Sequence, residues 1–470
     1  LAYHSNMALQ RKQEVRAAYT SGQSRVLVTT TALGTGVNLP ATHLVIRDTT
    51  FHPDGRISAA QILQMLGRAG RGERKGNAVV VLRPNDDWEA GDLKTALVDD
   101  PLPEMTSGLL GTNHRTLQSE PSLEAATRVV LSMLCRYGKE GVSEDDLQKF
   151  GASMLAGPEM ESVLHAALTW LQRHLLAHRR EEDGMIVATT LGAAGAAGGL
   201  PPAVSSSIGA LFRDLFSVGD GPSLVAQISP LDVLLLAELL GDRAFVSPTY
   251  SKELPPKVDD WTLASREKSF LFQSWIRGAE KASKASEILG SLNISGAGKS
   301  DEQLRRFAYK KMFSAIVLWS RGQGVRWEDI ARRWGLDADQ VAEEEWIRNR
   351  SWLIAGMAEI FDVRCFYFHL REDCQASDEQ IKDAKRALQR ARACCFQLLG
   401  RLKYCSPLGP LLARMKMSGA KGVGAATIAK LENAGLTSPE AIRTISEKQM
   451  KELKLDKKRI NTLQAYLRRA

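Results

Sequence analysis

The sequence has few cysteines, few aromatic residues and no long apolar run. Aromatic residues make up 6% of the 470 residues. No apolar stretch approaches the ~20 residues that a membrane-spanning helix needs, so no membrane partner is expected. There is no signal peptide. The 6 cysteines form no CxxC pair and no Cys/His group with zinc spacing. This favours reduced thiols in an intracellular protein and predicts no metal site. The cysteines are Cys135, Cys365, Cys374, Cys394, Cys395 and Cys405.

A second absence concerns nucleotide binding. The one stretch that looks like a Walker A loop is 295–300, Ser-Gly-Ala-Gly-Lys-Ser, followed by an acidic pair. It lacks the glycine that a P-loop has five positions before Gly298, where Asn293 stands, and no strand precedes it. The chain also starts in mid-pattern with Leu1. We therefore expect the lobe with Walker A and B segments to lie upstream, and the 470 residues alone not to hydrolyse ATP.

Basic charge is concentrated at one end of the chain. The net charge is +8, yet residues 401–470 alone hold 15 Lys/Arg against 5 Asp/Glu, a difference of +10. Such an uneven distribution indicates an electrostatic surface for a polyanion rather than general solubility. The length predicts about three to five domains.

Residues 25–82 alternate between short apolar runs and a helical pattern. We expect strands over 25–30, 44–46 and 77–82, the first of them buried, and a helix over 57–66. A loop over 31–41 carries hydroxyl groups and glycines where backbone amides could approach phosphates. Strand, loop, strand, helix and strand predict half of a RecA-like α/β domain.

The helix over 57–66 leads into Gln-Met-Leu-Gly-Arg-Ala-Gly-Arg, residues 64–71. At helical spacing, Gln64, Arg68 and Arg71 share one face. Arginine offers a planar, permanently charged fork that suits phosphate, and two such forks can stabilise charge that develops during phosphoryl transfer. A solvated basic helix end is the alternative.

These residues resemble known helicase motifs. Residues 29–41, Thr-Thr-Thr-Ala-Leu-Gly-Thr-Gly-Val-Asn-Leu-Pro-Ala, resemble motif V of superfamily-two helicases, and residues 64–71 resemble motif VI. The Gly-Val-Asn-Leu-Pro form of motif V resembles the form found in the branch that contains HelQ-type DNA helicases and Ski-type RNA helicases. His4 resembles the histidine of motif IVa.

The resemblance implies a role for each matching position. Arg68 and Arg71 would be arginine fingers on the γ-phosphate of ATP, and Gln64 would sense that phosphate or couple it to the nucleic acid. ATP and Mg²⁺ would be held mainly by the upstream lobe. The remaining positions would contact the nucleotide (Gly36, Asn38, Gly67) or the tracked strand (His4, Thr30).

Between the two motifs, residues 47–58 occupy the place of a strand-separating β-hairpin in this branch. Pro53-Asp54-Gly55 supplies turn chemistry. Phe51 or His52 could stack on the last base pair. A plain surface turn is the alternative.

Residues 83–202 predict a connector, a small helical domain and a linker. Residues 83–121 are polar and rich in Pro, Gly and Asp, which indicates a connector around the first domain. Helices over 122–137, from Ser143 and over 160–177, with a hairpin over 179–190, predict a winged helix over 122–192. In most winged helices the third helix binds DNA, whereas the resemblance favours bracing of two RecA-like lobes. Residues 193–202 are rich in small residues and indicate a linker.

Residues 193–404 predict a helical bundle, the counterpart of the ratchet domain in the resembling family. Its helices are expected over 208–216, 230–240, 265–288, 302–321, 327–334, 340–361 and 378–403. Trp352-Leu353 resembles the Trp-Leu pair of the ratchet helix, where the tryptophan stacks on a base. The family arginine seven residues earlier is here Glu345, so Arg348 could take over the phosphate contact. Trp346 is a rival stacker, and core packing of both tryptophans is the alternative.

Residues 405–470 predict a helix-hairpin-helix module. Lys421-Gly422-Val423-Gly424 makes a tight turn between helices over 411–417 and 425–434, where backbone amides and a helix N-terminus can hold a DNA phosphate. Residues 453–456 indicate a second, degenerate hairpin. The alternative is a basic solvated bundle.

Together these features predict a multidomain fold: a partial RecA-like α/β lobe with its connector (1–121), a winged helix (122–192), an all-α ratchet bundle (193–404) and a helix-hairpin-helix module (405–470). The expected function is that of an ATP-dependent 3′→5′ DNA helicase of the HelQ type, acting on single-stranded and tailed or forked DNA in the cytoplasm, nucleoid or nucleus. Two alternatives stay open: a Ski-type RNA helicase, and a non-catalytic DNA-binding subunit built from helicase parts. Repair, recombination and defence against foreign DNA all fit.

Overall fold

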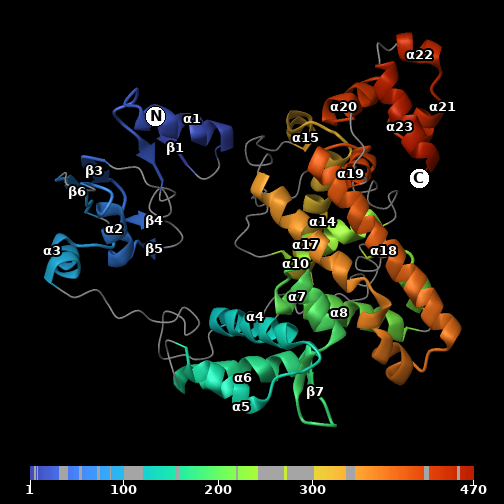
Figure 1. The fold of residues 1–470 in the computed structure, drawn as a ribbon, viewed down its shortest axis with the longest axis horizontal. Helices are drawn as coiled ribbons and strands as arrows, with labels where there is room; N and C mark the ends of the chain where they lie inside the picture. The colour runs from blue at the N-terminus through green and yellow to red at the C-terminus, as the bar shows by residue number, and fades with distance from the viewer. Residues whose placement is uncertain are drawn as a thin grey trace. The chain divides into compact units, whose positions relative to one another are not determined.

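The chain forms two compact units, residues Leu1–Thr106 and Ser107–Ala470. Each is described by itself, and Figure 1 labels their elements. The computed structural model describes residues 1–4, 7, 9–30, 41–51, 55–70, 75–84, 86–99, 120–154, 158–218, 221–241, 269–271, 301–334, 344–417, 423–452 and 456–469.

The first unit contains two pairs of parallel strands. β1 (Ala2–Tyr3) pairs with β2 (Val28–Thr29), and β3 (His43–Ile46) pairs with β6 (Asn77–Val80). Helix α1 (Leu9–Thr20) connects the first pair. The parallel arrangement agrees with an α/β layer. However, the expected burial of the strand over 25–30 is wrong, since Val26 is 66% and Val28 65% exposed. Nothing among the described residues covers these side chains.

A small core holds the rest of this unit together. It is formed from β3, from the helix α2 (Ala59–Leu66) and from the short helix α3 (Ala90–Lys94), which continues as a π-helix, η2 (Thr95–Asp99). Its buried members are Ile46, Ile57, Ile62, Trp88 and Leu93. Because Trp88 and Leu93 belong to this core, the first part of the predicted connector is an integral part of the unit. Residues 100–119 lie outside the described part of the chain.

The second unit begins with three helices and a hairpin: α4 (Glu120–Tyr137), α5 (Glu144–Ala152), α6 (Pro158–Arg173), β7 (Ala177–Arg179) and β8 (Ile186–Ala188). The predicted start of α5 is confirmed, because Ser143 and Asp146 form a reciprocal capping box. The predicted extent of α6 was too long. It ends at Arg173, and Leu175 takes a left-handed φ of 58° before the chain enters β7.

The predicted linker over 193–202 is wrong, because helix α7 (Thr190–Ala197) occupies its first half and the next helix, α8 (Pro202–Ser217), begins at its last residue. Its small residues permit close packing instead of a loose connection. A Cβ on Gly192 would meet the Leu176 carbonyl oxygen, and one on Gly195 would overlap the Ser205 side chain. Small residues therefore allow neighbouring backbone to approach.

The bundle that follows confirms most of the predicted helices. α10 (Pro230–Leu240) and α15 (Trp327–Trp334) have the predicted bounds. Of the helix expected over 265–288, the structure describes three residues, Ser269, Phe270 and Leu271. The remaining elements are α8 (Pro202–Ser217), α9 (Gly221–Val225), α14 (Asp301–Gly322), α17 (Glu344–Ile360), η5 (Val363–Cys365), η6 (His369–Asp373) and α18 (Asp378–Tyr404). They share one large apolar core with α4 to α7.

The C-terminal residues form a module with a core of its own. Its helices are α19 (Gly409–Met417), α20 (Ala425–Asn433), α21 (Pro439–Thr444), α22 (Glu447–Glu452) and α23 (Lys457–Arg469). Gln464 of α23 donates to the carbonyl oxygens of Ile442 at 3.0 Å and Ile445 at 3.2 Å, which fastens α23 to the end of α21. A search of the described helices finds none with the length and apolar character to cross a membrane.

Candidate functional site

Helix α2 delivers the arginine segment and ends before it. Ser58 and Gln61 form a capping box at its start, and Ile62 is fully buried beneath it. The Gly67 N–H donates to the Leu63 carbonyl at 2.9 Å and caps the last turn. Arg68 therefore lies just beyond the helix. The expected continuous helical face over Gln64, Arg68 and Arg71 stops at this cap.

Backbone hydrogen bonds join the segment resembling motif VI to the end of the one resembling motif V. The Ala41 N–H donates to the Arg68 carbonyl at 3.1 Å, and the Gly70 N–H donates to the Ala41 carbonyl at 2.9 Å. Gly70 adopts a left-handed φ of 72°, which glycine tolerates without strain. A Cβ on Gly76 would overlap the backbone of Ala69 and Gly70. These small residues hold two segments together that lie nearly thirty positions apart in the sequence, about the length of one βαβ unit.

Gln64 and Gly67 are exposed beside this junction, and Arg68 is half-buried. A guanidinium, an amide and a glycine backbone are a donor set that suits an anionic phosphate end. Among the described residues, no group of three or more His, Cys, Asp and Glu side chains could hold a metal ion. Three further predicted site residues, Gly36, Asn38 and Arg71, lie outside the described part.

His4 and Thr30 are brought together at one sheet edge. His4 follows β1, Thr30 follows β2, and Tyr3 pairs with Thr29 in the parallel register. The Thr30 N–H donates to the Tyr3 carbonyl at 3.4 Å. Because the carboxyl ends of parallel strands form the usual binding edge of such sheets, both residues stand where a ligand strand could pass.

The predicted hairpin is present as β4 (Thr50–Phe51) and β5 (Gly55–Arg56), with Phe51 opposite Gly55. The Ile57 N–H donates to the Thr49 carbonyl at 2.8 Å, and Trp88 Nε1 donates to the Ile57 carbonyl at 2.8 Å. Its base is thus anchored to the unit's core. His52, the next residue after β4 in the sequence, lies outside the described residues.

Asp48 lies just before the hairpin and forms ion pairs with Arg47 at 2.6 Å and Arg83 at 2.8 Å. The hydrogen bond from Arg47 is the main reason that the pKa of the Asp48 carboxyl is lowered. The pairs are exposed at the arginine side and contribute little stability, but they orient the strand that enters the hairpin.

The two tryptophans of helix α17 differ in exposure to solvent. Trp352 is 40% exposed and Arg348, one turn earlier, is exposed as well. Trp346 is 1% exposed and donates Nε1 to Glu238 Oε1 at 2.8 Å. The rival role of Trp346 as a base stacker is therefore wrong, because its indole belongs to the core.

A buried ionic network was missed by the sequence reasoning. Arg350 and Glu238 form an ion pair of 2.9 Å with both side chains fully buried, and Trp346 shares the same carboxylate. The sequence did hold a signal for this network. Apart from Asp232 in the first turn, Glu238 is the one acidic residue in the strongly apolar helix α10. A charge in such a run predicts a buried partner.

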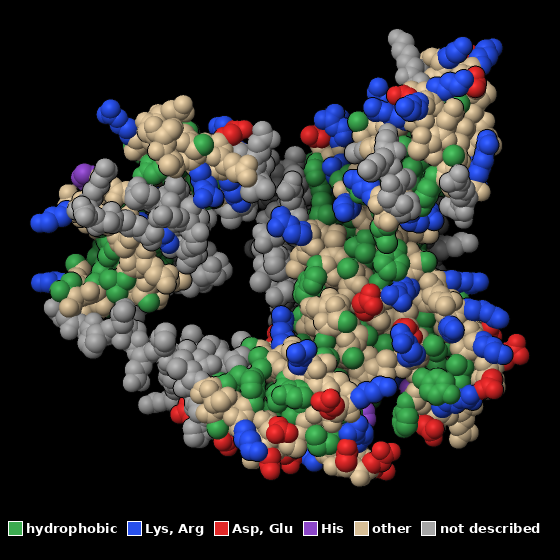
Figure 2. All heavy atoms as spheres, viewed as in Figure 1, with side chains coloured by type: hydrophobic (Ala, Val, Ile, Leu, Met, Phe, Trp, Pro, Cys, Tyr) green, Lys and Arg blue, Asp and Glu red, His purple; other side chains and the backbone are tan. Residues whose placement is uncertain are grey.

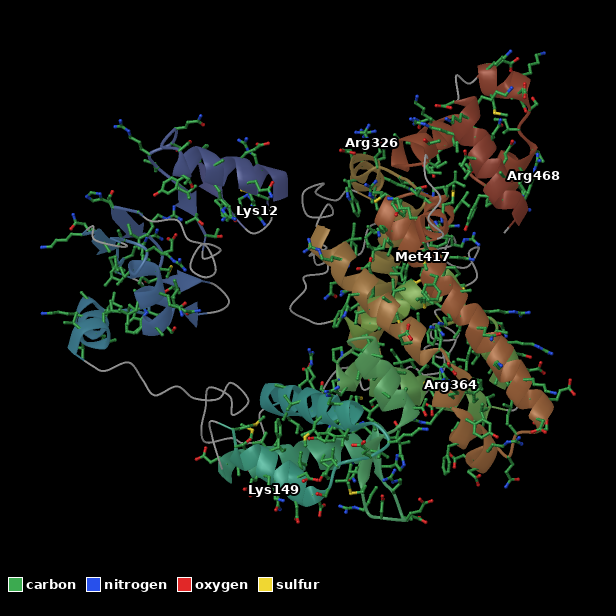
Figure 3. The ribbon with its side chains drawn as sticks, in the orientation of Figure 1. Lys12, Lys149, Arg326, Arg364, Met417 and Arg468 are labelled. Atoms are coloured by element: carbon green, nitrogen blue, oxygen red, sulfur yellow. The ribbon has the colours of Figure 1, made fainter. Side chains whose placement is uncertain are left out.

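The C-terminal module places a helix start after the predicted glycine turn. Gly424 is the N-cap of α20, while Lys421 and Gly422 lie outside the described residues. Figure 2 shows Lys and Arg side chains over the helices of this module and Asp and Glu side chains gathered over α5 and α6. Met417, at the end of α19, is 88% exposed, and Figure 3 labels it together with Arg468 of α23.

Comparison with known proteins finds relatives among helicases. Residues 1–73 match the family model described as helicase conserved C-terminal domain. The chain is 43% identical over 84 residues to human "Probable ATP-dependent DNA helicase HFM1", which is 17% of this chain and 6% of that protein.

Two longer alignments extend past this domain. Mouse DNA polymerase theta is 23% identical over 394 residues, 77% of this chain and 14% of that protein. The Drosophila melanogaster U5 small nuclear ribonucleoprotein 200 kDa helicase is 30% identical over 205 residues, 40% of this chain and 9% of that protein. The alignments thus cover small parts of much longer relatives. The family model and these relatives together support a superfamily-two helicase, with the helicase C-terminal domain at residues 1–73.

Proposed function

We propose that this chain forms the nucleic-acid-tracking part of an ATP-dependent 3′→5′ DNA helicase of the HelQ type. The observation that carries the proposal is the backbone junction of Ala41 with Arg68 and Gly70 inside the region that matches the helicase domain. This junction keeps the two segments that resemble motifs V and VI at a fixed separation. The 3′→5′ polarity comes from the resemblance.

In this proposal Arg68 and Arg71 stabilise charge on the γ-phosphate, and Gln64 couples that phosphate to the strand. Gly67 leaves room beside the phosphates, while Gly36 and Asn38 lie near the ribose. When bound with Mg²⁺, ATP supplies the free energy of phosphoryl transfer. The carboxylates that hold Mg²⁺ are assigned to a Walker-type lobe rather than to the residues described here.

The nucleic acid is contacted at four places. His4 and Thr30 bind the backbone at the sheet edge, and the β4–β5 hairpin, with Phe51 and His52, splits the duplex. Trp352 stacks on a base of the released strand while Arg348 contacts a phosphate. In the C-terminal module, Lys421, Gly422 and Gly424 hold duplex backbone as a helix-hairpin-helix.

We assign the domains as follows: the RecA-like lobe with its connector at 1–121, a winged helix at 122–192, the ratchet bundle at 193–404 and the DNA-binding module at 405–470. The three helices and antiparallel hairpin of 120–188 support the winged-helix assignment. We propose intracellular DNA, single-stranded and tailed or forked, as the substrate.

An RNA helicase is the second candidate. The similarity to the U5 small nuclear ribonucleoprotein helicase favours it. The basic C-terminal module favours DNA, because paired helices around a glycine turn bind DNA backbone without reading sequence. A non-catalytic DNA-binding subunit is the third.

Unwinding by the full-length protein that carries these residues tests the proposal. A duplex with a 3′ single-stranded tail should be unwound in DNA and not in RNA, and Arg68→Ala or Arg71→Ala should abolish unwinding while strand binding survives. Arg128→Ala, in a surface pair with Glu124 on α4, is the matched control and should unwind normally. Preference for RNA would favour the second candidate, and binding without ATP-dependent unwinding would favour the third.

A further inference from the structure

A histidine, a cysteine, an aspartate and a serine meet where the end of α8 lies against η6. His369 Nδ1 is 2.7 Å from Asp373 Oδ2. Its other nitrogen, Nε2, is 3.4 Å from Cys374 Sγ and 3.2 Å from Ser217 Oγ. The site is separate from every residue assigned above to ATP or nucleic acid.

The imidazole is held in one orientation. Its side chain is 13% exposed, and the Nδ1–H can donate to the Asp373 carboxylate, so that Nε2 faces the thiol. The Arg213 carbonyl oxygen lies 3.1 Å from Nε2. It can accept the Nε2–H after the ring takes a proton from the thiol. Nucleophile, base and orienting carboxylate thus stand in the order that activates a weak nucleophile.

Ser217 is the less suitable nucleophile of the two. Its hydroxyl donates to the Arg213 carbonyl at 2.9 Å, so its proton is directed away from the ring. Cys374 Sγ also donates to a carbonyl oxygen, that of Phe216, but this contact is long at 3.7 Å, and Sγ lies closer, at 3.4 Å, to His369 Nε2. The thiol is also the better nucleophile by its chemistry.

Cys374 opens onto a pocket of ≈ 270 Å³. The wall combines apolar side chains such as Phe216 and Leu370 with the polar groups of Asp373 and Gln380. This volume fits a small molecule rather than a protein segment. Other cysteines lack such a setting. Burial raises the pKa of the Cys365 thiol to about 12, and Cys395 is fully buried with its pKa raised as well.

We propose that Cys374 is a modification site that forms a mixed disulfide with low-molecular-weight disulfides. His369 Nε2 takes the thiol proton, and Sγ attacks one sulfur of the incoming disulfide. A new sulfur–sulfur bond forms, the original one breaks, and the leaving thiolate receives the proton from His369. The Cys374 sulfur is oxidised from the thiol to the disulfide level while the leaving sulfur is reduced from the disulfide to the thiol level, so the small disulfide is itself the oxidant. Asp373 is a positioning residue that keeps Nε2 toward the thiol.

The test uses 2-hydroxyethyl disulfide on the folded chain, with peptide mass spectrometry to follow each cysteine over time. Cys374 should be modified about tenfold faster than Cys135 or Cys405, and Cys374→Ser should remove that adduct alone. His369→Gln and Asp373→Asn should each slow the reaction at Cys374 about tenfold and leave the rate at Cys405 unchanged.

Folding is checked by the thermal midpoint of each variant. Asp373 is 61% exposed, so Asp373→Asn keeps the fold even where His369→Gln weakens it. Asp373→Glu should restore part of the rate, since it again offers a carboxylate to Nδ1. The proposal is overturned if Cys374 reacts no faster than Cys405, or if Asp373→Asn folds normally and reacts at the original rate.

Discussion

Arg350 Nε donates to Glu238 Oε1 at 2.9 Å, and both side chains are completely removed from solvent. The pair connects α17, which carries Trp352, to α10 in the middle of the bundle. Trp346 donates to the same carboxylate oxygen at 2.8 Å. Arg350 also donates through Nη1 to Asn349 Oδ1 at 2.7 Å. The buried charges are thus matched by hydrogen bonds, the condition under which such a pair is tolerated.

Glu238→Gln should destabilise the Ser107–Ala470 unit by about 3–5 kcal/mol, because Arg350 would remain buried without its carboxylate. Denaturant unfolding of variant and parent measures the loss. The control is Glu359→Gln, which breaks an exposed pair with Arg392 at 3.4 Å and should cost less than about 1 kcal/mol. Equal losses in the two variants would contradict a special role of the buried pair.

Gly76→Ala should lower nucleic-acid-stimulated ATP hydrolysis by the full-length protein about tenfold or more. The added methyl group would collide with the backbone of Ala69 and Gly70 and displace Arg68 from its junction with Ala41. Gly91→Ala is the matched control, because open space surrounds Gly91 in α3. A Gly76→Ala enzyme with normal turnover and normal melting would show that the junction does not position the arginines.

Trp352→Ala should weaken single-strand binding by about 1–3 kcal/mol, the contribution of one stacked base. Its indole is 40% exposed, so truncation should leave the fold intact. Fluorescence anisotropy with a labelled oligonucleotide gives the affinity. Tyr137→Ala, which truncates a 50% exposed ring at the end of α4, should bind normally. Unchanged binding by Trp352→Ala would assign the indole to packing alone.

Lys430→Ala combined with Lys458→Ala should reduce the slope of log Kd against log salt by about one for each phosphate that a lysine no longer neutralises. Both lysines are exposed on helices of the C-terminal module, α20 and α23. Lys149→Ala, on α5 and labelled in Figure 3, is the control and should keep the parental slope. The same slope in the double variant would exclude these helices from the DNA-binding surface.

Asp362 should make a small pH-dependent contribution to stability. The hydrogen bond from Arg364 is the main cause that lowers the pKa of the Asp362 carboxyl below its ordinary 3.8. Stabilisation is therefore fully present above pH 3.8 and is lost as the pH falls through the lower folded pKa. Arg364 is 77% exposed, so the effect should stay within about 1 kcal/mol.

Denaturant unfolding between neutral and acid pH measures the difference between Asp362→Asn and the parent. That difference should shrink as the pH falls below 3.8. A constant difference across this range would contradict the assignment.

The ends of a helix were predictable where the residues that cap it are neighbours in the sequence. Ser229, Pro230 and Asp232 mark the start of α10 by a capping box with proline at the first helical position, and Gly241 follows its end. The strands β3 and β6 were likewise predicted from apolar runs, whereas the β4–β5 hairpin was expected from the resemblance together with its turn residues.

Predictions failed where the answer depended on a distant partner. The linker prediction for 193–202 mistook small residues for looseness, although Gly195 and Gly198 are small because neighbouring elements approach them. Trp346 and Trp352 lie on one helix six positions apart, yet the first is buried in the apolar core, where Glu238 of α10 accepts its indole N–H. The exposure of Val28 also depends on a distant partner, because only a neighbouring element that covers the strand could bury its side chain.

The contact of Gly198 with Gly356 has a mechanical consequence. A Cβ on Gly198 would overlap the backbone of Gly356, so main chain meets main chain between the end of α7 and the C-terminal part of α17. Side chains can change rotamer and absorb a displacement, whereas touching backbones cannot. Helix α7 also packs against α4, so it is in contact with both α4 and α17. A rotation of the α4–α6 helices would therefore also move α17, the helix that carries Trp352.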